Sequence, residues 1–222
     1  MNDPTKTEGG FSGISKMLLF DFDGTVADTM SVAHDILNDM SREFGFRELP
    51  RERLEDARKM KTREFIRHLG IRSWRVPIIA RRGLQLLHER IDLVQPIPGM
   101  PEVLSSLHSR GFKLAILTSN SEVNVNAFLQ KHDLAYFDFV HSSSKIFGKG
   151  REIRSILKRE KLRPQEILYI GDETRDIEAA RETGLRVAAV SWGYNSGEAL
   201  LSLDPDHMID SPHDLLELLQ KP

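Results

Sequence analysis

Residues 17–26 read MLLFDFDGTV, four apolar residues followed by two aspartates one residue apart and then Gly-Thr. The apolar run predicts a short buried strand that begins near Lys16 and ends at Phe20. Acidic side chains directly after such a strand are informative, because open α/β sheets bind ligands at the carboxyl ends of their strands. This stretch therefore predicts the first strand of a parallel sheet and one part of its site.

The second half of the chain repeats this pattern of short apolar strands, each followed by a helix. Strands are expected at residues 113–117, 137–141, 167–170 and 187–190, and helices at 100–110, 122–132, 151–161, 177–183 and 214–219. This alternation predicts an α/β fold, a doubly wound, Rossmann-like parallel sheet with helices on both faces.

Helical spacing of apolar residues replaces this rhythm between the first strand and the others. We expect an all-helical insert at residues 30–96, ending in a linker at 95–99, and an α/β core of residues 16–29 and 97–222. Residues 1–15 are polar and predict a flexible lead-in without a signal peptide. The insert holds 14 Lys/Arg against 10 Asp/Glu. It is either a solvated surface or a basic lid over an acidic site.

Composition excludes several classes of protein. The 222 residues include no cysteine, so a disulfide framework, a thiolate zinc site and a cysteine nucleophile are excluded. The absence of cysteine fits a protein of the reducing cytoplasm, which is the expected location. A net charge of −2 gives no electrostatic reason to expect nucleic acid as a partner. No apolar run approaches the ~20 residues of a membrane span, so no membrane partner is expected. A monomer or weak homodimer is the default expectation.

Polar residues gather where the expected strands end. Asp21, Thr118-Ser119-Asn120 and Asp172 each follow a strand, so they should meet in one crevice. The neighbouring carboxylates of Asp21 and Asp23 repel each other unless a cation lies between them, and oxygen ligands without His or Cys favour Mg²⁺. Asp172 and Asp176 share a helix face and could complete the metal site. Taken alone, each motif could instead be a helix cap or a turn.

In this order, the motifs resemble those of the haloacid dehalogenase superfamily, in its phosphoglycolate phosphatase-like branch with a helical cap. The matching stretches are DFDGTVADT at 21–29, LTSN at 117–120, Lys149, and GDETRD at 171–176. The resemblance implies that the insert is the cap. It also implies a Mg²⁺-dependent phosphatase acting on a small anionic phosphorylated metabolite.

The resemblance also implies roles for residues. Asp21 matches the nucleophile that forms an aspartyl-phosphate, and Asp23 the general acid that later activates water. The carboxylates of Asp21 and Asp172 and the main-chain carbonyl of Asp23 would hold Mg²⁺, with Asp176 bound through water or behind them. The phosphoryl oxygens would be held by Thr118 and by main-chain groups at Ser119 and Asn120.

A lysine should neutralise the charge on the nucleophile and the phosphoryl group. Lys145 and Lys149 both follow the third expected strand. We favour Lys149, which directly precedes the start of the next helix.

Other activities on the same motifs remain open. A dehalogenase is disfavoured, because those family members lack the second aspartate and the metal. A phosphomutase would keep the same motifs. A phosphonatase would need a buried cap lysine, whereas Lys59 and Lys61 lie in a charged stretch, 58–61, that predicts solvated surface. A non-catalytic phosphate-binding regulator would have no physical need for the clustered acids.

Specificity is expected to come from the cap. Closure over the core would exclude water, and basic cap residues could contact a second anionic group of the substrate. The candidates are Lys59, Lys61, Arg63, Arg81 and Arg82. The histidines of the cap, His34 and His68, are expected in packing or surface roles, and Trp192-Gly193-Tyr194 is a candidate for the rim of the site.

Overall fold

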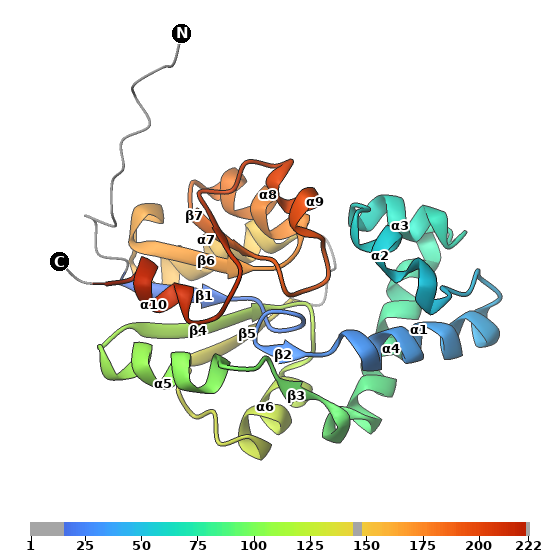
Figure 1. Cartoon of the computed structure of the whole chain (residues 1–222), viewed down its shortest axis with the longest axis horizontal. Helices are drawn as coiled ribbons and strands as arrows, with labels where there is room; N and C mark the ends of the chain where they lie inside the picture. Colours follow the sequence, from blue (N-terminus) through green and yellow to red (C-terminus); the bar gives the residue numbers. More distant parts are fainter. Residues whose placement is uncertain (1–15, 144–147, 221–222) are drawn as a thin grey trace, which may run out of the picture.

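A six-stranded parallel sheet lies at the centre of the fold in the computed structural model, which describes residues 16–143 and 148–220. The strand order is β5-β4-β1-β6-β7-β8 (Figure 1). The strands are β1 (Met17–Phe20), β4 (Lys113–Thr118), β5 (Phe139–Ser142), β6 (Ile167–Gly171), β7 (Arg186–Val190) and β8 (His207–Ile209). The predicted doubly wound α/β fold is confirmed. The lead-in expected at residues 1–15 and the candidate Lys145 lie outside the described residues.

Alternation along β1 explains why helices cover both faces of the sheet. Leu18 and Phe20 pack into one apolar cluster, and Met17 and Leu19 pack into another. Helices α5 (Met100–Ser109), α6 (Glu122–Lys131) and α10 (Asp214–Leu218) contribute to the first cluster, and α7 (Lys149–Glu160), α8 (Thr174–Thr183) and α9 (Gly197–Leu201) to the second. A strand buried on both faces must be apolar at every position, as β1 is.

Between β2 (Ala27–Asp28) and β3 (Gln95–Pro96) the chain forms a helical lobe, residues 30–94, beside the sheet (Figure 1). The lobe contains α1 (Met30–Phe44), α2 (Leu54–Arg58), α3 (Thr62–His68) and α4 (Val76–Glu89), with short 3-10 turns at 51–53, 73–75 and 91–93. Apolar faces of α1 and α4 pack together through residues such as Ile36, Met40 and Ile79. The two long helices therefore bury part of the lobe's apolar surface between them, in a cluster that continues into the core.

The two chain segments that join the lobe to the sheet pair with each other. Ala27 faces Pro96 and Asp28 faces Gln95 in an antiparallel ribbon. Part of the linker expected at 95–99 is thus a strand. The other differences are small. β8 and α9 lack a strong sequence pattern and were not predicted, α7 begins at Lys149 instead of residue 151, α8 begins at Thr174 instead of residue 177, and β5 lies about two residues later than expected. Within the described ranges, no helix has the length and apolar character needed to cross a membrane.

Candidate active site

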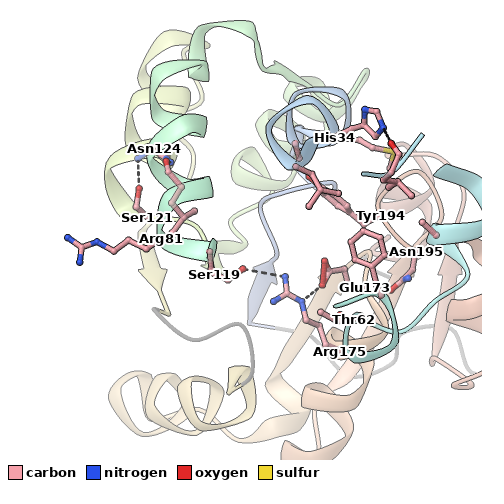
Figure 2. A pocket seen from close by; sticks show the side chains of 18 of the residues that line it. His34, Thr62, Arg81, Ser119, Ser121, Asn124, Glu173, Arg175, Tyr194 and Asn195 are labelled. Carbon is pink, nitrogen blue, oxygen red and sulfur yellow. Dashed lines mark hydrogen bonds and ion pairs between the residues drawn. The ribbon is translucent and has the colours of Figure 1, made fainter. Parts of the chain in front are cut away.

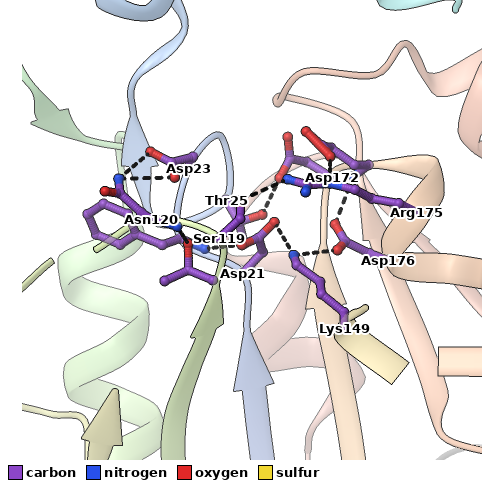
Figure 3. Close-up of polar contacts among 12 residues, drawn as sticks. Asp21, Asp23, Thr25, Ser119, Asn120, Lys149, Asp172, Arg175 and Asp176 are labelled. Carbon is purple, nitrogen blue, oxygen red and sulfur yellow. Dashed lines mark hydrogen bonds and ion pairs between the residues drawn. The ribbon is translucent and has the colours of Figure 1, made fainter. Parts of the chain in front are cut away.

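Parallel pairing brings the acidic motifs together. β1 pairs with β6 in the register Phe20 to Ile170, so Asp21 and Asp172 follow neighbouring strands. The backbone N–H of Asp21 donates to the Ile170 carbonyl at 2.8 Å, which continues the ladder past the strand end. Thr118 ends β4, on the other side of β1. The carboxyl edge of the sheet therefore carries all three motifs (Figure 3).

Lys149 joins two of these carboxylates. Its Nζ lies 2.6 Å from Asp21 Oδ2 and 2.6 Å from Asp176 Oδ1, and it donates to the Tyr169 hydroxyl at 3.0 Å (Figure 3). Its side chain is only 2 % exposed, and those of its two acidic partners are 3 % and 0 % exposed. Burial lowers the pKa of Lys149, but Asp176 and Asp21 outweigh this and raise it above its ordinary value. The lysine is a buried cation held between Asp21 and Asp176.

Asp21, Asp172 and Asp176 form a candidate metal centre. Each offers a carboxylate oxygen, and these atoms lie within 4.8 Å of one another. Thr25 Oγ1 and the backbone N–H of Tyr194 each donate to Asp172 at 2.6 Å, which fixes its orientation. Three buried carboxylates against one lysine leave negative charge, and hard oxygen donors match a divalent cation such as Mg²⁺. The residues present therefore fit a metal.

The pKa values of Asp21 and Asp172 are raised because these acids are buried close together. Burial raises the pKa of Asp21 to about 7, despite the opposing effect of Lys149. Burial, with the neighbouring Asp21 charge, raises the pKa of Asp172 well above its ordinary value. A divalent cation bound between them would favour the ionised forms and reverse these shifts.

Asp23 lies outside the acidic cluster. Its two carboxylate oxygens accept hydrogen bonds from Asn120 Nδ2 at 3.0 and 3.1 Å (Figure 3). Partial burial raises its pKa to about 6, while hydrogen bonds from Asn120 and Thr29 oppose the rise. A carboxyl group with a pKa near neutrality can both donate and accept a proton, as an acid-base catalyst must.

The loop after β4 lies opposite the acidic cluster. The backbone N–H of Asn120 donates to Thr118 Oγ1 at 2.9 Å, which tightens the turn. Arg175 reaches from the start of α8 to Ser119 Oγ at 3.3 Å and forms an ion pair with Glu173 (Figure 2). Arg175 adds a second, partly buried cation to the site, a role that its place between Thr174 and Asp176 did not indicate.

Two glycines let other chain segments approach Asp172. Gly24 has φ +76°, and a Cβ there would lie 2.4 Å from Asp172 Oδ2. A Cβ on Gly193 would lie 2.2 Å from the Asp172 Cβ. The turn at Gly24 and the 192–194 segment, expected at the rim, thus close directly on this carboxylate. Tyr194 continues toward the β2 segment, and its hydroxyl lies 2.9 Å from Thr29 Oγ1.

A cavity of about 1190 Å³ opens between the helical lobe and the sheet edge. Apolar lobe residues such as Leu37, Phe65 and Leu84 form much of its wall, and Ser119 and Arg175 lie on the core side (Figure 2). The cavity therefore has room for a small organic molecule next to the acidic cluster.

The basic residues expected on the lobe are distributed differently. Arg81 lines the cavity, while Lys59 and Lys61 are more than half exposed and pair with Glu198 and Glu178 at 3.9 and 3.6 Å. Arg82 pairs within the lobe with Glu43 at 3.2 Å, and Arg63 is exposed. His34 is buried and bonds the Leu49 carbonyl at 2.8 Å, in a packing role. His68 is exposed at the end of α3.

Arg58 departs from the solvated surface expected at 58–61. Its side chain is 19 % exposed and donates to the carbonyls of Ser191 and Gly193 at 3.2 and 2.9 Å. Asn195 Nδ2 returns hydrogen bonds to the carbonyls of Arg58 and Met60 at 2.9 and 3.0 Å. The long-range contacts of this stretch were not visible in its charged composition.

Residues 18–190 match the sequence family described as haloacid dehalogenase-like hydrolase. The chain belongs to this family. It is 35% identical over 201 residues to phosphoglycolate phosphatase of Synechococcus elongatus, covering 90% of this chain and 95% of that protein. It is 29% identical over 221 residues to phosphoglycolate phosphatase of Nitrosospira multiformis, covering 93% and 96% of the two chains. This haloacid dehalogenase-like hydrolase is an enzyme, a phosphatase acting on phosphoric monoesters.

Solved structures share its fold. A haloacid dehalogenase-like family protein of Streptococcus pneumoniae superposes with a TM-score of 0.78 at 22% identity, covering 92% of this chain and 98% of that one. CbbY of Rhodobacter sphaeroides, solved in complex with phosphate, gives a TM-score of 0.72 at 22% identity, with 93% and 99% covered. Both similarities include the helical lobe as well as the sheet.

Proposed function

We propose that the chain is a Mg²⁺-dependent phosphatase that hydrolyses a small anionic phosphate monoester through an aspartyl-phosphate on Asp21. The buried contact between Lys149 and Asp21 is the observation that carries the proposal. A carboxylate repels a phosphate monoester unless cations lie close to both groups. Lys149 supplies one such charge, and the cluster of Asp21, Asp172 and Asp176 supplies a site for another.

In the first step, an Asp21 oxygen attacks phosphorus and the bond from phosphorus to the leaving oxygen breaks. Protonated Asp23 gives its proton to that oxygen, so the product leaves as an alcohol. Lys149 stays paired with Asp21 and Asp176 and stabilises the charge that gathers on the phosphoryl oxygens. Ser119 and Arg175 line the cavity that would hold the ester.

In the second step, a water molecule attacks the phosphorus of the aspartyl-phosphate. Asp23, now ionised, takes one proton from the water, and the bond between phosphorus and Asp21 breaks. Inorganic phosphate and the Asp21 carboxylate are regenerated, and Asp23 is again protonated. The pKa of Asp23, about 6, suits both roles near neutral pH.

The residues that would hold Mg²⁺ are Asp21, Asp172 and Asp176, with the main-chain carbonyl of Asp23 implied by the family resemblance. Bound there, the ion would supply positive charge between the nucleophile and the phosphoryl group.

For the substrate, the names of the curated relatives indicate phosphoglycolate. A sugar phosphate monoester is the other small ester that we consider. Arg175 and Arg81 line the cavity and could attract a second anionic group. The phosphonatase alternative is not supported, because Lys59 and Lys61 are 59% and 54% exposed and neither is a buried lysine. A phosphomutase keeps the same acidic motifs, so an experiment must distinguish it from a phosphatase.

The test is phosphate release from a panel of phosphorylated metabolites and one aryl phosphate. Wild type and Asp21→Asn are compared with Mg²⁺ and with EDTA. The proposal expects release only with both Mg²⁺ and Asp21, and fastest release from small anionic esters. Isomerisation of a sugar phosphate without net release would instead favour the mutase, and no turnover of any compound would contradict the proposal.

A further inference from the structure

Two asparagines behind Asp23 are buried and fully hydrogen-bonded. Asn120 and Asn124 are each only 1 % exposed, on the loop after β4 and in the first turn of α6. Buried amides have strict hydrogen-bonding needs, so their partners fix which way each amide points. Their partners lead from the acid-base carboxylate to the helical lobe.

The orientation of Asn120 is fixed from both ends. Its Nδ2 donates to both oxygens of Asp23. Its Oδ1 accepts from the backbone N–H of Ser121 at 2.8 Å and from Asn124 Nδ2 at 3.0 Å. A flipped amide would place its NH₂ group against two donors and its oxygen against a carboxylate. Asn120 therefore holds the Asp23 carboxylate in one position.

Asn124 in turn is bound to the helical lobe. Its Nδ2 also donates to the Leu84 carbonyl at 3.1 Å, and its Oδ1 lies 2.9 Å from His88 Nδ1. Because both protons of its amide are already used, its oxygen must accept from a protonated Nδ1 of His88. Leu84 and His88 both belong to α4, so the lobe supplies two of the three groups that orient Asn124.

We propose that Asn124 is a positioning residue that couples the placement of the helical lobe to the general acid through the chain His88–Asn124–Asn120–Asp23. When α4 lies against α6, Asn120 is held against Asp23. When the lobe moves away, Asn124 loses two partners and the hold on Asp23 weakens. This inference rests on the proposed function, because it assigns this series of hydrogen bonds an effect on proton donation by Asp23.

Leaving-group dependence separates this role from a merely structural one. An alkyl phosphate needs a proton on its leaving oxygen, whereas an aryl phosphate can release a phenolate without one. The quantity kcat/KM reports the transfer step, in which Asp23 acts as the acid. Loss of positioning should therefore reduce kcat/KM for the alkyl ester much more than for the aryl ester.

The experiment measures kcat/KM for an alkyl and an aryl phosphate in five proteins. These are wild type, Asn124→Asp, His88→Ala, His88→Asn and the control Asn126→Ala, which lies exposed on the same helix. Asn124→Asp keeps the shape but removes both donors. We expect a loss of about 10–100-fold for the alkyl ester and of less than about threefold for the aryl ester.

His88→Ala should show the same selective loss in smaller degree. His88→Asn restores an N–H donor near the position of Nδ1 and should recover much of it, while Asn126→Ala should match wild type. Equal losses for both esters, or no loss, in Asn124→Asp and His88→Ala overturn the inference. If wild type hydrolyses neither ester, the proposed function fails first, a result distinct from an active wild type with unselective variants.

Discussion

Lys149 Nζ and Asp21 Oδ2 lie 2.6 Å apart, although 128 residues separate them in the sequence. Lys149 begins α7, and Gly148 before it has φ 141°, a conformation that favours glycine. The helix start therefore aims the lysine at the end of β1. The pair holds a buried cation against the carboxylate that we propose as the nucleophile.

Replacing this lysine should impair chemistry more than folding. We expect Lys149→Met to lower kcat by about 10²–10³-fold, because the charge on the nucleophile and phosphoryl group loses its fixed cation. Lys149→Arg should not restore activity, since a planar guanidinium does not fit a site built for an ammonium group. Steady-state kinetics checks this, with Lys158→Met, exposed on the same helix, as the control. Full activity of Lys149→Met would exclude the assigned role.

Removing one acid from the metal centre should stabilise the metal-free protein. The raised pKa of Asp172 means that the folded state binds the proton more tightly than the unfolded state. Burial of Asp172 therefore destabilises the folded protein. This loss of stability is absent at low pH and grows as the pH rises above the ordinary pKa of an aspartate. Asp172→Asn keeps one oxygen that can accept from the Tyr194 N–H, and its new NH₂ group can donate to the Thr25 hydroxyl oxygen.

In EDTA at pH 8 we expect Asp172→Asn to melt higher than wild type, by about 2–4 °C for each kcal/mol relieved. The difference should shrink toward pH 5. Added Mg²⁺ should raise the melting temperature of wild type more than that of the variant. Equal responses of the two proteins to Mg²⁺ would show that Asp172 does not hold the ion.

Asp23 should set a pH limit on proton donation. Its pKa of about 6 lies above the ordinary value, so the protonated acid persists up to that pH and is lost above it. For an alkyl phosphate, kcat/KM should fall about tenfold per pH unit on the alkaline side. Asn120→Ala removes a hydrogen bond that favours the carboxylate, so this falling limb should move to higher pH. The substrate's own titration is the same in both proteins, and an unmoved limb would argue against Asp23 as the acid.

Contacts of Arg58 should hold the helical lobe on the core. Arg58→Ala removes two hydrogen bonds to carbonyls in the 191–193 segment. We expect KM to rise several-fold and amide exchange in residues 191–196 to accelerate, because the lobe opens more easily. Arg53→Ala is the matched control, as Arg53 is 68% exposed and pairs with Asp56 within the lobe. Unchanged exchange in Arg58→Ala would show that other contacts fix the lobe.

Strands and acidic motifs could be predicted because their signals are local. Residues 17–20 are apolar at every position, as burial on both faces requires, and Asp21 follows immediately. The resemblance to haloacid dehalogenases followed from such motifs and is confirmed by the family match. The two-residue strands at 27–28 and 95–96 are too short to show any period, so their pairing was not predictable.

Side-chain partners across the chain were harder to predict. Only main-chain contacts were predicted for Asn120, yet its side-chain amide donates to Asp23. Asn124 and Tyr169 belong to no recognised motif, so their contacts with Asn120 and Lys149 were not predicted. Such roles depend on which helices meet at the sheet edge. Preference for Lys149 over Lys145 rested on position alone, and the structure brings Lys149 to Asp21.

In the proposed mechanism the phosphoryl group is transferred to Asp21 before water attacks it. The most direct test is a rapid acid quench of Asp23→Asn with Mg²⁺ and an isotope-labelled aryl phosphate, followed by peptide mapping. An aryl ester can phosphorylate Asp21 without the acid, and loss of the base should slow breakdown of the aspartyl-phosphate. We expect label on the peptide that contains Asp21 and none in Asp21→Asn. Turnover of wild type with no label trapped on this peptide in Asp23→Asn, or with label on another residue, would contradict it.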